Sequence, residues 1–84
     1  ARYQGALAGR AGCEGERFTL AAGATLGDLA EEIWARRPAL GEIGRPAAGG
    51  VSMIRWAVGG RIAGMDLTLS DGDEVVLFAG AAGG

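Results

Sequence analysis

The feature that most constrains the fold is one amphipathic helix, which we expect over residues 25–37. Thr25 followed three residues later by Asp28 resembles a capping box, and Pro38 ends the helix. The apolar side chains between these signals recur at the spacing of one helix face: Leu26, Leu29, Ala30, Ile33 and Trp34. One helix of this kind can cover only one face of one sheet, so the remaining residues must supply β-strands.

The segments on both sides of this helix carry the alternation and turn residues of strands. Before it, we expect a weak strand at 2–8, a flexible connection at 9–15 and a second strand at 16–21. Directly after it, residues 39–50 predict a loop with a short helical turn around 40–43. This half of the chain therefore contributes one hairpin and the helix.

The second half predicts three more strands, with tight turns between them. Gly59-Gly60 suits a two-residue hairpin, because both glycines tolerate positive φ, and Asp71-Gly72-Asp73 predicts another turn. The continuous apolar run within 74–79 predicts a central strand buried on both faces. The three strands are expected over residues 51–58, 61–64 and 74–79.

This order of elements predicts the α+β class, with a mixed sheet of about five strands and one main helix packed on one face. If the first and last strands lie side by side at the centre, the arrangement is a β-grasp (ubiquitin-like) roll. We divide the 84 residues into a β-grasp domain at 1–79 and a flexible C-terminal tail at 80–84.

Composition excludes several classes of function. The chain has 17 glycines, but its net charge of only −2 favours a compact domain over disorder. Histidine and lysine are both absent, which excludes the usual zinc sites, histidine acid–base catalysis and Schiff-base chemistry. A sequence pI near 4.9 argues against nucleic-acid binding, and no apolar run is long enough for a membrane span. We expect a cytoplasmic protein that is not catalytic alone.

Most residue groups with chemical potential have a simpler structural explanation. Asp71, Asp73 and Glu74 could hold a cation, but a solvated turn explains them better. Cys13 lacks an activating base and is expected to be inert. Trp34 and Trp56 could anchor an interface, or they could pack in the core.

The C-terminal end is different, because an apolar strand is followed only by small residues: Gly80, Ala81, Ala82, Gly83 and Gly84. Fully extended, these five residues reach roughly 17 Å at about 3.3 Å each. Ordering them costs roughly 5–10 kcal/mol, which so little apolar surface does not offset. Binding through this tail must therefore recruit the globular body, and the sheet face around Phe78 is our candidate, with core packing of Phe78 as the alternative.

The segment LSDGDEVVLFAGAAGG at 69–84 resembles the C-terminal signature of the MoaD/ThiS family of ubiquitin-like sulfur carriers. The capped helix TLGDLAEEIWARRP and the hairpin WAVGGRIA follow the order of elements in that family. The likeness is strongest to its molybdopterin branch, the small subunits of molybdopterin synthase, because sulfur carriers for thiamine usually lack an equivalent of residues 38–50. It departs from the family at Ala79 and Gly80, where prolines are often found.

The resemblance implies a carrier cycle without a permanently bound cofactor. An E1-like adenylating enzyme would use ATP to activate the carboxylate of Gly84, and sulfur from a desulfurase or rhodanese would convert it to a thiocarboxylate. A large molybdopterin synthase-type subunit would then receive the tail, with Gly83, Ala82, Ala81, Gly80 and Phe78 as partner-binding residues. The alternatives are a carrier for thiamine or another sulfur-containing metabolite, a ubiquitin-like protein modifier, and a plain interaction module without tail chemistry.

Overall fold

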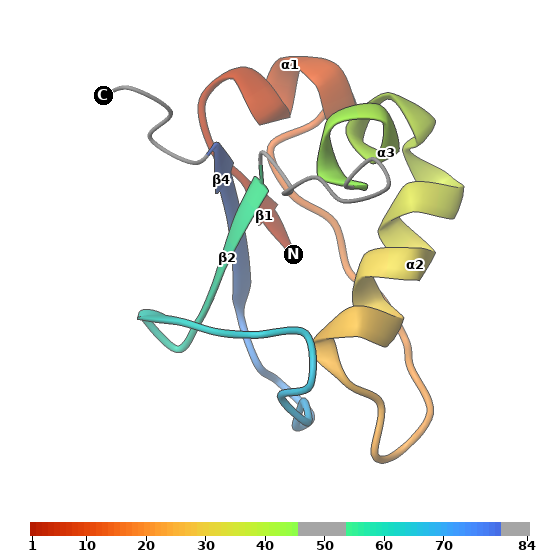
Figure 1. Cartoon of the computed structure of the whole chain (residues 1–84), viewed down its shortest axis with the longest axis vertical. Coiled ribbons are helices and arrows are strands. Elements are labelled where there is room, and N and C mark those ends of the chain that lie inside the picture. The colour runs from red at the N-terminus through yellow and green to blue at the C-terminus, as the bar shows by residue number, and fades with distance from the viewer. Residues whose placement is uncertain (46–53, 80–84) are drawn as a thin grey trace.

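The computed structural model describes residues 1–45 and 54–79, which form one sheet with helices packed against it. Figure 1 shows the strands on one side, α2 and α3 facing them, and α1 over one end of the sheet. The elements are β1 (Arg2–Tyr3), α1 (Ala6–Ala11), α2 (Leu26–Arg36), α3 (Pro38–Gly44), β2 (Ile54–Val58), β3 (Arg61–Ile62) and β4 (Val75–Ala79).

The four strands form a mixed sheet in the order β1-β4-β2-β3. β4 runs parallel to β1, with Tyr3 opposite Leu77, and antiparallel to β2 along its whole length, with Trp56 opposite Leu77. The first and last strands therefore lie side by side, as the β-grasp arrangement requires. The prediction of an α+β fold with a central final strand is confirmed.

Helix α2 is the element that the sequence predicts best. The Thr25 hydroxyl accepts a hydrogen bond from the Asp28 backbone N–H at 3.3 Å, and the Asp28 carboxylate accepts one from the Thr25 N–H at 2.9 Å. This reciprocal pair is the predicted capping box. The predicted apolar face is buried in full: Leu26, Leu29, Ala30, Ile33 and Trp34.

The prediction for the N-terminal segment is wrong. Instead of a strand over 2–8, the chain forms only the two-residue β1 and then turns into α1. Alanine favours helix, and Leu7 and Ala11, four residues apart, both become buried on one helical face. The loose alternation of small residues over 2–8 fits either structure, and burial of Leu7 favours the helix.

The second predicted strand, over 16–21, is also absent, so the described residues give four strands rather than about five. On the edge of β1 away from β4, this segment makes a single antiparallel bridge, from Gly15 to Arg2, with backbone hydrogen bonds from Tyr3 to Glu14 and from Glu16 to Ala1 on either side of it. Because β1 is two residues long, it offers no edge along which a longer strand could pair. Phe18 packs partly against the core, and the Arg36 guanidinium lies 4.3 Å from its ring centroid.

Pro38 does end α2, but it also begins α3, which replaces the first half of the loop expected at 39–50 and includes the short helical turn expected around 40–43. Proline is favoured in the first turn of a helix, because its missing N–H has no partner there. Leu40 is fully buried, and Gly44 lies against the Trp34 indole, where a Cβ would stand 2.2 Å from Cη2. Residues 46–50 of that loop lie outside the described residues.

The β2–β3 hairpin forms as predicted, although its strands are shorter. Gly59 and Gly60 both have positive φ, at 59° and 82°, as a tight two-residue turn requires. β3 ends at Ile62 rather than at residue 64, and β2 is described from Ile54, so residues 51–53 of the predicted strand lie outside the described residues.

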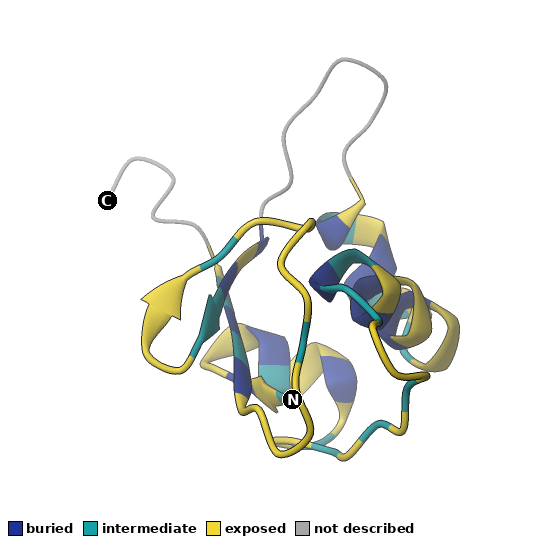
Figure 2. Cartoon of the chain, turned by 90° about the horizontal axis from the view of Figure 1, so that it is seen from below, coloured by how far each residue is buried: buried dark blue, intermediate teal, exposed yellow. Residues whose placement is uncertain are grey.

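The core lies between the helices and one face of the sheet, as the buried residues in Figure 2 show. Trp34 of α2 and Trp56 of β2 meet there edge to face, with ring centroids 5.7 Å apart. Both rings are at most 7 % exposed, so the core interpretation of the two tryptophans is confirmed.

Candidate functional site

The carboxyl end of β4 is the part of the described chain that leads to the predicted tail. Every residue of β4 pairs with β2, and Val76 and Leu77 also pair with β1. The Leu77 carbonyl accepts a further hydrogen bond from the Gln4 N–H at 3.0 Å. The predicted site residues Gly80, Ala81, Ala82, Gly83 and Gly84 lie outside the described residues, so the structure describes the base from which they start.

Phe78 lies on the sheet face turned away from the helices. Its neighbour Leu77 is fully buried, whereas Phe78 is partly exposed and is not among the described side chains that pack against the core. The prediction that this strand is buried on both faces is therefore wrong. Only Val75 and Leu77 point into the core, because no described helix covers the other side of β4.

The strand register shows which side chains share that side with Phe78. Arg55 stands directly opposite Phe78, and Arg2, Val76, Ala57 and Ile62 follow one another across the four strands. Ile62 is 64 % exposed, the most of any described large apolar side chain. We call this set the outer sheet face: Arg2, Arg55, Ala57, Ile62, Val76 and Phe78.

Sequence reasoning predicted only Phe78 on the outer sheet face. The alternation of Arg55 and Ala57 with buried neighbours was a usable signal, because residues two apart in a strand share a face. The position of Arg2 could not be read in this way. It depends on the parallel pairing of two strands that are more than 70 residues apart in the sequence.

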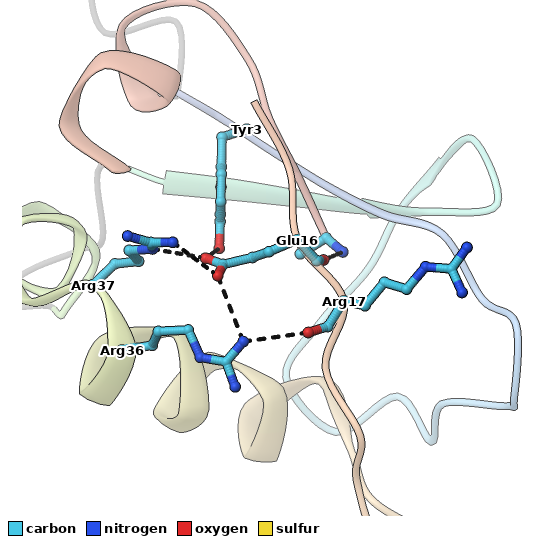
Figure 3. A network of polar contacts seen from close by, with 6 residues as sticks. Tyr3, Glu16, Arg17, Arg36 and Arg37 are labelled. Atoms are coloured by element: carbon cyan, nitrogen blue, oxygen red, sulfur yellow. Dashed lines mark hydrogen bonds and ion pairs between the residues drawn. The ribbon is translucent and has the colours of Figure 1, made fainter. Parts of the chain in front are cut away.

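A polar cluster, shown in Figure 3, surrounds the carboxylate of Glu16 on the helix side of the molecule. Arg37 holds both carboxylate oxygens, with Nε to Oε2 at 2.9 Å and Nη2 to Oε1 at 3.0 Å. The Tyr3 hydroxyl donates to Oε2 at 2.6 Å, and the Arg36 guanidinium lies 3.5 Å from Oε1. The cluster joins β1 to the junction between α2 and α3.

The hydrogen bonds from Arg37 lower the pKa of Glu16 to about 2, helped by the hydrogen bond from Tyr3. Burial raises the pKa of the Tyr3 hydroxyl, and the adjacent carboxylate raises it further. Near neutral pH the Glu16 carboxyl group therefore stays ionised and the Tyr3 hydroxyl stays protonated. Since no buried polar side-chain atom among the described residues lacks a hydrogen-bond partner, we interpret the cluster as a structural clamp rather than a reactive site.

The other groups considered in the sequence have structural surroundings. Cys13 is partly buried, packs against the core and is not in a disulfide. The Asp73 carboxylate accepts a hydrogen bond from the Ser70 N–H at 2.8 Å, which confirms the predicted turn. Within residues 1–45 and 54–79, no three acidic or cysteine side chains gather as a metal site would require. None of the helices described there has the length and apolar character to cross a membrane.

The comparison with protein families identifies the family to which a chain with this sheet and this C-terminal end belongs. The model of the ThiS family matches residues 2–84. The chain belongs to the ThiS family. The match runs through the C-terminal glycine pair as well as the described fold, and it confirms the resemblance noted in the sequence. No curated protein matches the chain significantly.

Solved structures agree with this assignment of family and fold. Two structures of small archaeal modifier protein 1 (SAMP1) from Haloferax volcanii are 27 % and 26 % identical to this ThiS-family chain, with TM-scores of 0.87 and 0.84. The alignment with the first structure covers 99 % of this chain and 94 % of the SAMP1 chain. The alignment with the second covers 93 % of this chain and 91 % of the SAMP1 chain. A Pyrococcus furiosus protein assigned as molybdopterin converting factor subunit 1 is 31 % identical, with a TM-score of 0.79 and coverage of 93 % and 91 %. The β-grasp fold is therefore established.

Proposed function

We propose that this ThiS-family chain is a sulfur carrier for molybdopterin synthesis, with the carboxyl group of Gly84 as the carrier. In the first step, that carboxylate attacks the α-phosphate of ATP on an E1-like enzyme, releasing pyrophosphate and forming an acyl-adenylate. A persulfide from a desulfurase or rhodanese then attacks the carbonyl carbon, and AMP leaves. A second thiol cleaves the resulting acyl disulfide, which leaves a thiocarboxylate on Gly84 and a disulfide on the donor.

The observation that carries this proposal is the family match over residues 2–84, which includes Gly83 and Gly84. The molybdopterin branch is supported by the likeness to the Pyrococcus furiosus protein, at 31 % identity. The chemistry also agrees with the residues. Glycine has no Cβ, so two glycines let an enzyme's backbone approach the reacting carbonyl closely.

The described part of the chain supports separate roles in this cycle, with the sheet binding the partner enzymes and the tail carrying the reacting group. β4 is held by pairing on both sides, so it presents the start of the tail from a fixed position. Phe78 lies only two residues before Gly80 and faces away from the core. We propose that the large molybdopterin synthase-type subunit and the adenylating enzyme take hold of the outer sheet face and then receive the tail.

Intact mass spectrometry tests the proposal directly. The purified chain is incubated with the adenylating enzyme, ATP, a desulfurase and cysteine, and we expect the mass gain for replacement of one oxygen by sulfur. Deleting Gly84 should abolish the gain, and so should Gly83→Val, while circular dichroism stays unchanged. Phe78→Ser should slow loading, whereas Met65→Ser, a matched change of a 42 % exposed side chain elsewhere, should not. Absence of the sulfur-containing product from the wild-type chain would refute the proposal.

Protein modification is a second candidate, favoured by the two SAMP1 structures at TM-scores of 0.87 and 0.84. It needs the same acyl-adenylate, but a lysine amine of a target protein then displaces AMP and forms an isopeptide bond. The chain has no lysine of its own, so it could not form lysine-linked polymers. Tryptic digestion of a lysate from its own host separates the two functions. Cleavage after Arg61, the last arginine of the chain, leaves residues 62–84 attached to target lysines if the chain modifies proteins, and this remnant should vanish when the gene for this chain is deleted.

A further inference from the structure

We propose that Arg2 and Arg55 determine which nucleophiles the activated C-terminus of this chain can meet. They place positive charge beside the start of the tail on groups that cannot be acylated, so the chain's own side chains do not capture the activated carboxyl group of Gly84. The inference rests on the proposed function, which makes Gly84 an acylating group. It holds for either acceptor, sulfur or a target lysine, because both routes pass through the acyl-adenylate.

The strand register puts both arginines next to the strand that leads to the tail. Arg55 of β2 stands directly opposite Phe78, and Arg2 of β1 stands opposite Val76, two residues earlier in β4. Neighbouring strands lie about 4.8 Å apart, and residues two apart along a strand share a face. Arg2 and Arg55 therefore flank β4 from its two neighbouring strands, on the same side of the sheet as Phe78.

The tail is long enough to return to these two positions. Gly84 follows Phe78 by six residues, which span at most roughly 20 Å. Gly-rich segments average roughly 5–6 Å times the square root of the number of residues, which gives about 13 Å end to end for six. Arg55 is one strand spacing from Phe78, and Arg2 is about 8 Å away, one strand across and two residues along. A group at either position therefore meets the terminal carboxyl group at an effective concentration on the order of millimolar.

The charge of these side chains favours that encounter. Both are exposed, and neither has an ion pair among the described residues, where the ion-paired arginines are Arg36, Arg37 and Arg45. The C-terminal carboxylate is negative, and so is the phosphate of its acyl-adenylate. Opposite charge therefore draws the end of the tail toward Arg2 and Arg55.

The kind of cation decides what such an encounter produces. A deprotonated lysine amine attacks the carbonyl carbon of an acyl-adenylate: a C–N bond forms, the C–O bond to AMP breaks, and the nitrogen loses a proton. Within one chain the product is a lactam, which can no longer carry sulfur. A guanidinium stays protonated because its pKa exceeds 12, so it offers no lone pair for this attack. None of the 84 residues is a lysine, and all eight cationic side chains are arginines.

The test measures capture of an activated Gly84 in the chain itself. Each variant is prepared with Gly84 as a thioester of a small thiol and incubated near pH 9, where about 4 % of lysine amines are deprotonated. Intact mass spectrometry then separates the lactam, which is lighter than the free acid by one water, from the free acid and the remaining thioester. The test variants are Arg55→Lys and Arg2→Lys, which both keep the positive charge.

The matched control is Arg17→Lys, because Arg17 is also exposed and its side chain forms no ion pair among the described residues. The Glu16 N–H donates to the Ala1 carbonyl, so the chain runs past the start of β1 before it reaches Arg17. The control position therefore lies toward the end of the sheet where β4 begins, away from the tail. The wild-type thioester measures capture by the nucleophiles that every variant shares, the Ala1 amine and the Cys13 thiol.

We expect Arg55→Lys to form at least about tenfold more lactam than Arg17→Lys, at a rate that is independent of chain concentration. Arg2→Lys should also exceed the control. In the loading reaction with the adenylating enzyme, Arg55→Lys should lose sulfur-containing product to the lactam, whereas Arg17→Lys should load like wild type.

The outcomes separate this inference from the function on which it rests. If the Arg55→Lys and Arg2→Lys thioesters form no more lactam than the control, the inference is wrong and the carrier proposal is unaffected. If the lactam forms but the enzyme loads Arg55→Lys with sulfur as fully as wild type, the enzyme alone protects the carboxyl group, and the role of the arginines is refuted. A wild-type chain that the enzyme never loads refutes the proposed function and with it this role, even where the thioester variants form the lactam.

Discussion

Glu16 joins three segments that are far apart in the sequence, so its ionisation should control much of the stability of this small domain. Its side chain is 12 % exposed and accepts hydrogen bonds from Arg37 and Tyr3. We predict that Glu16→Gln, which keeps the shape but removes the charge, lowers the free energy of unfolding by about 2–3 kcal/mol near neutral pH.

The magnitude follows from the pKa of Glu16, which falls from 4.5 to about 2 on folding. Multiplying this difference by about 1.4 kcal/mol per pH unit gives about 3.5 kcal/mol as an upper limit. The folded-state pKa is the lower one, so the stabilisation is fully present above pH 4.5. It disappears as the pH falls through the folded-state value of about 2.

Urea unfolding followed by tryptophan fluorescence, repeated across this pH range, measures the effect. The difference between wild type and Glu16→Gln should be largest near neutral pH, shrink below pH 4.5 and become small near pH 2. The matched control is Glu31→Gln, because the Glu31–Arg45 pair is 65 % and 56 % exposed and should contribute less than about 1 kcal/mol. A Glu16→Gln variant as stable as wild type near neutral pH would refute the interpretation of this cluster as a clamp.

Four further substitutions test the packing and the cap of α2. Gly44→Ala should cost about 1–3 kcal/mol in urea unfolding, because the new Cβ would meet the Trp34 indole, and an unchanged midpoint would contradict that contact. Thr25→Ala should cost about 1 kcal/mol through loss of the capping box, and a neutral result in thermal unfolding would mean that the cap contributes nothing. Leu77→Ala should cost about 2–5 kcal/mol and Phe78→Ala less than half as much, and equal costs would place Phe78 in the core.

The elements that sequence reasoning predicted correctly are those whose signals are local. The α2 helix begins at a hydrogen-bonded pair three residues apart, and the Gly59-Gly60 turn needs only its own two dihedral angles. Neither depends on where the rest of the chain lies. The β4 strand was predicted for the same reason, since a run of Val, Leu and Phe favours strand wherever it pairs.

The errors occur where local preference is weak and tertiary contacts decide. Half of residues 2–11 are alanine or glycine, and burial of Leu7 against the sheet selects the helix. Once β1 is limited to two residues, the predicted strand at 16–21 loses its pairing edge. The described helices all pack against the first face of β4 and none covers the second, which a continuous apolar run cannot reveal.

The same distinction applies to the candidate site. Phe78 could be proposed from its position before the glycine tail, whereas its neighbours on the outer sheet face required the strand register. Arg2 reaches that face only through the parallel pairing of β1 with β4, which no local pattern encodes.

The central claim is that the carboxyl group of Gly84 alternates between oxygen and sulfur. Top-down mass spectrometry of the protein isolated from its own host, under conditions that preserve thiocarboxylates, measures this directly. We predict a chain that ends at Gly84, present partly with one oxygen replaced by sulfur, and a loss of the sulfur-containing form when the adenylating enzyme is deleted. A native chain that continues past Gly84 in its mature form, or one that carries only oxygen whatever the state of that enzyme, would contradict the claim.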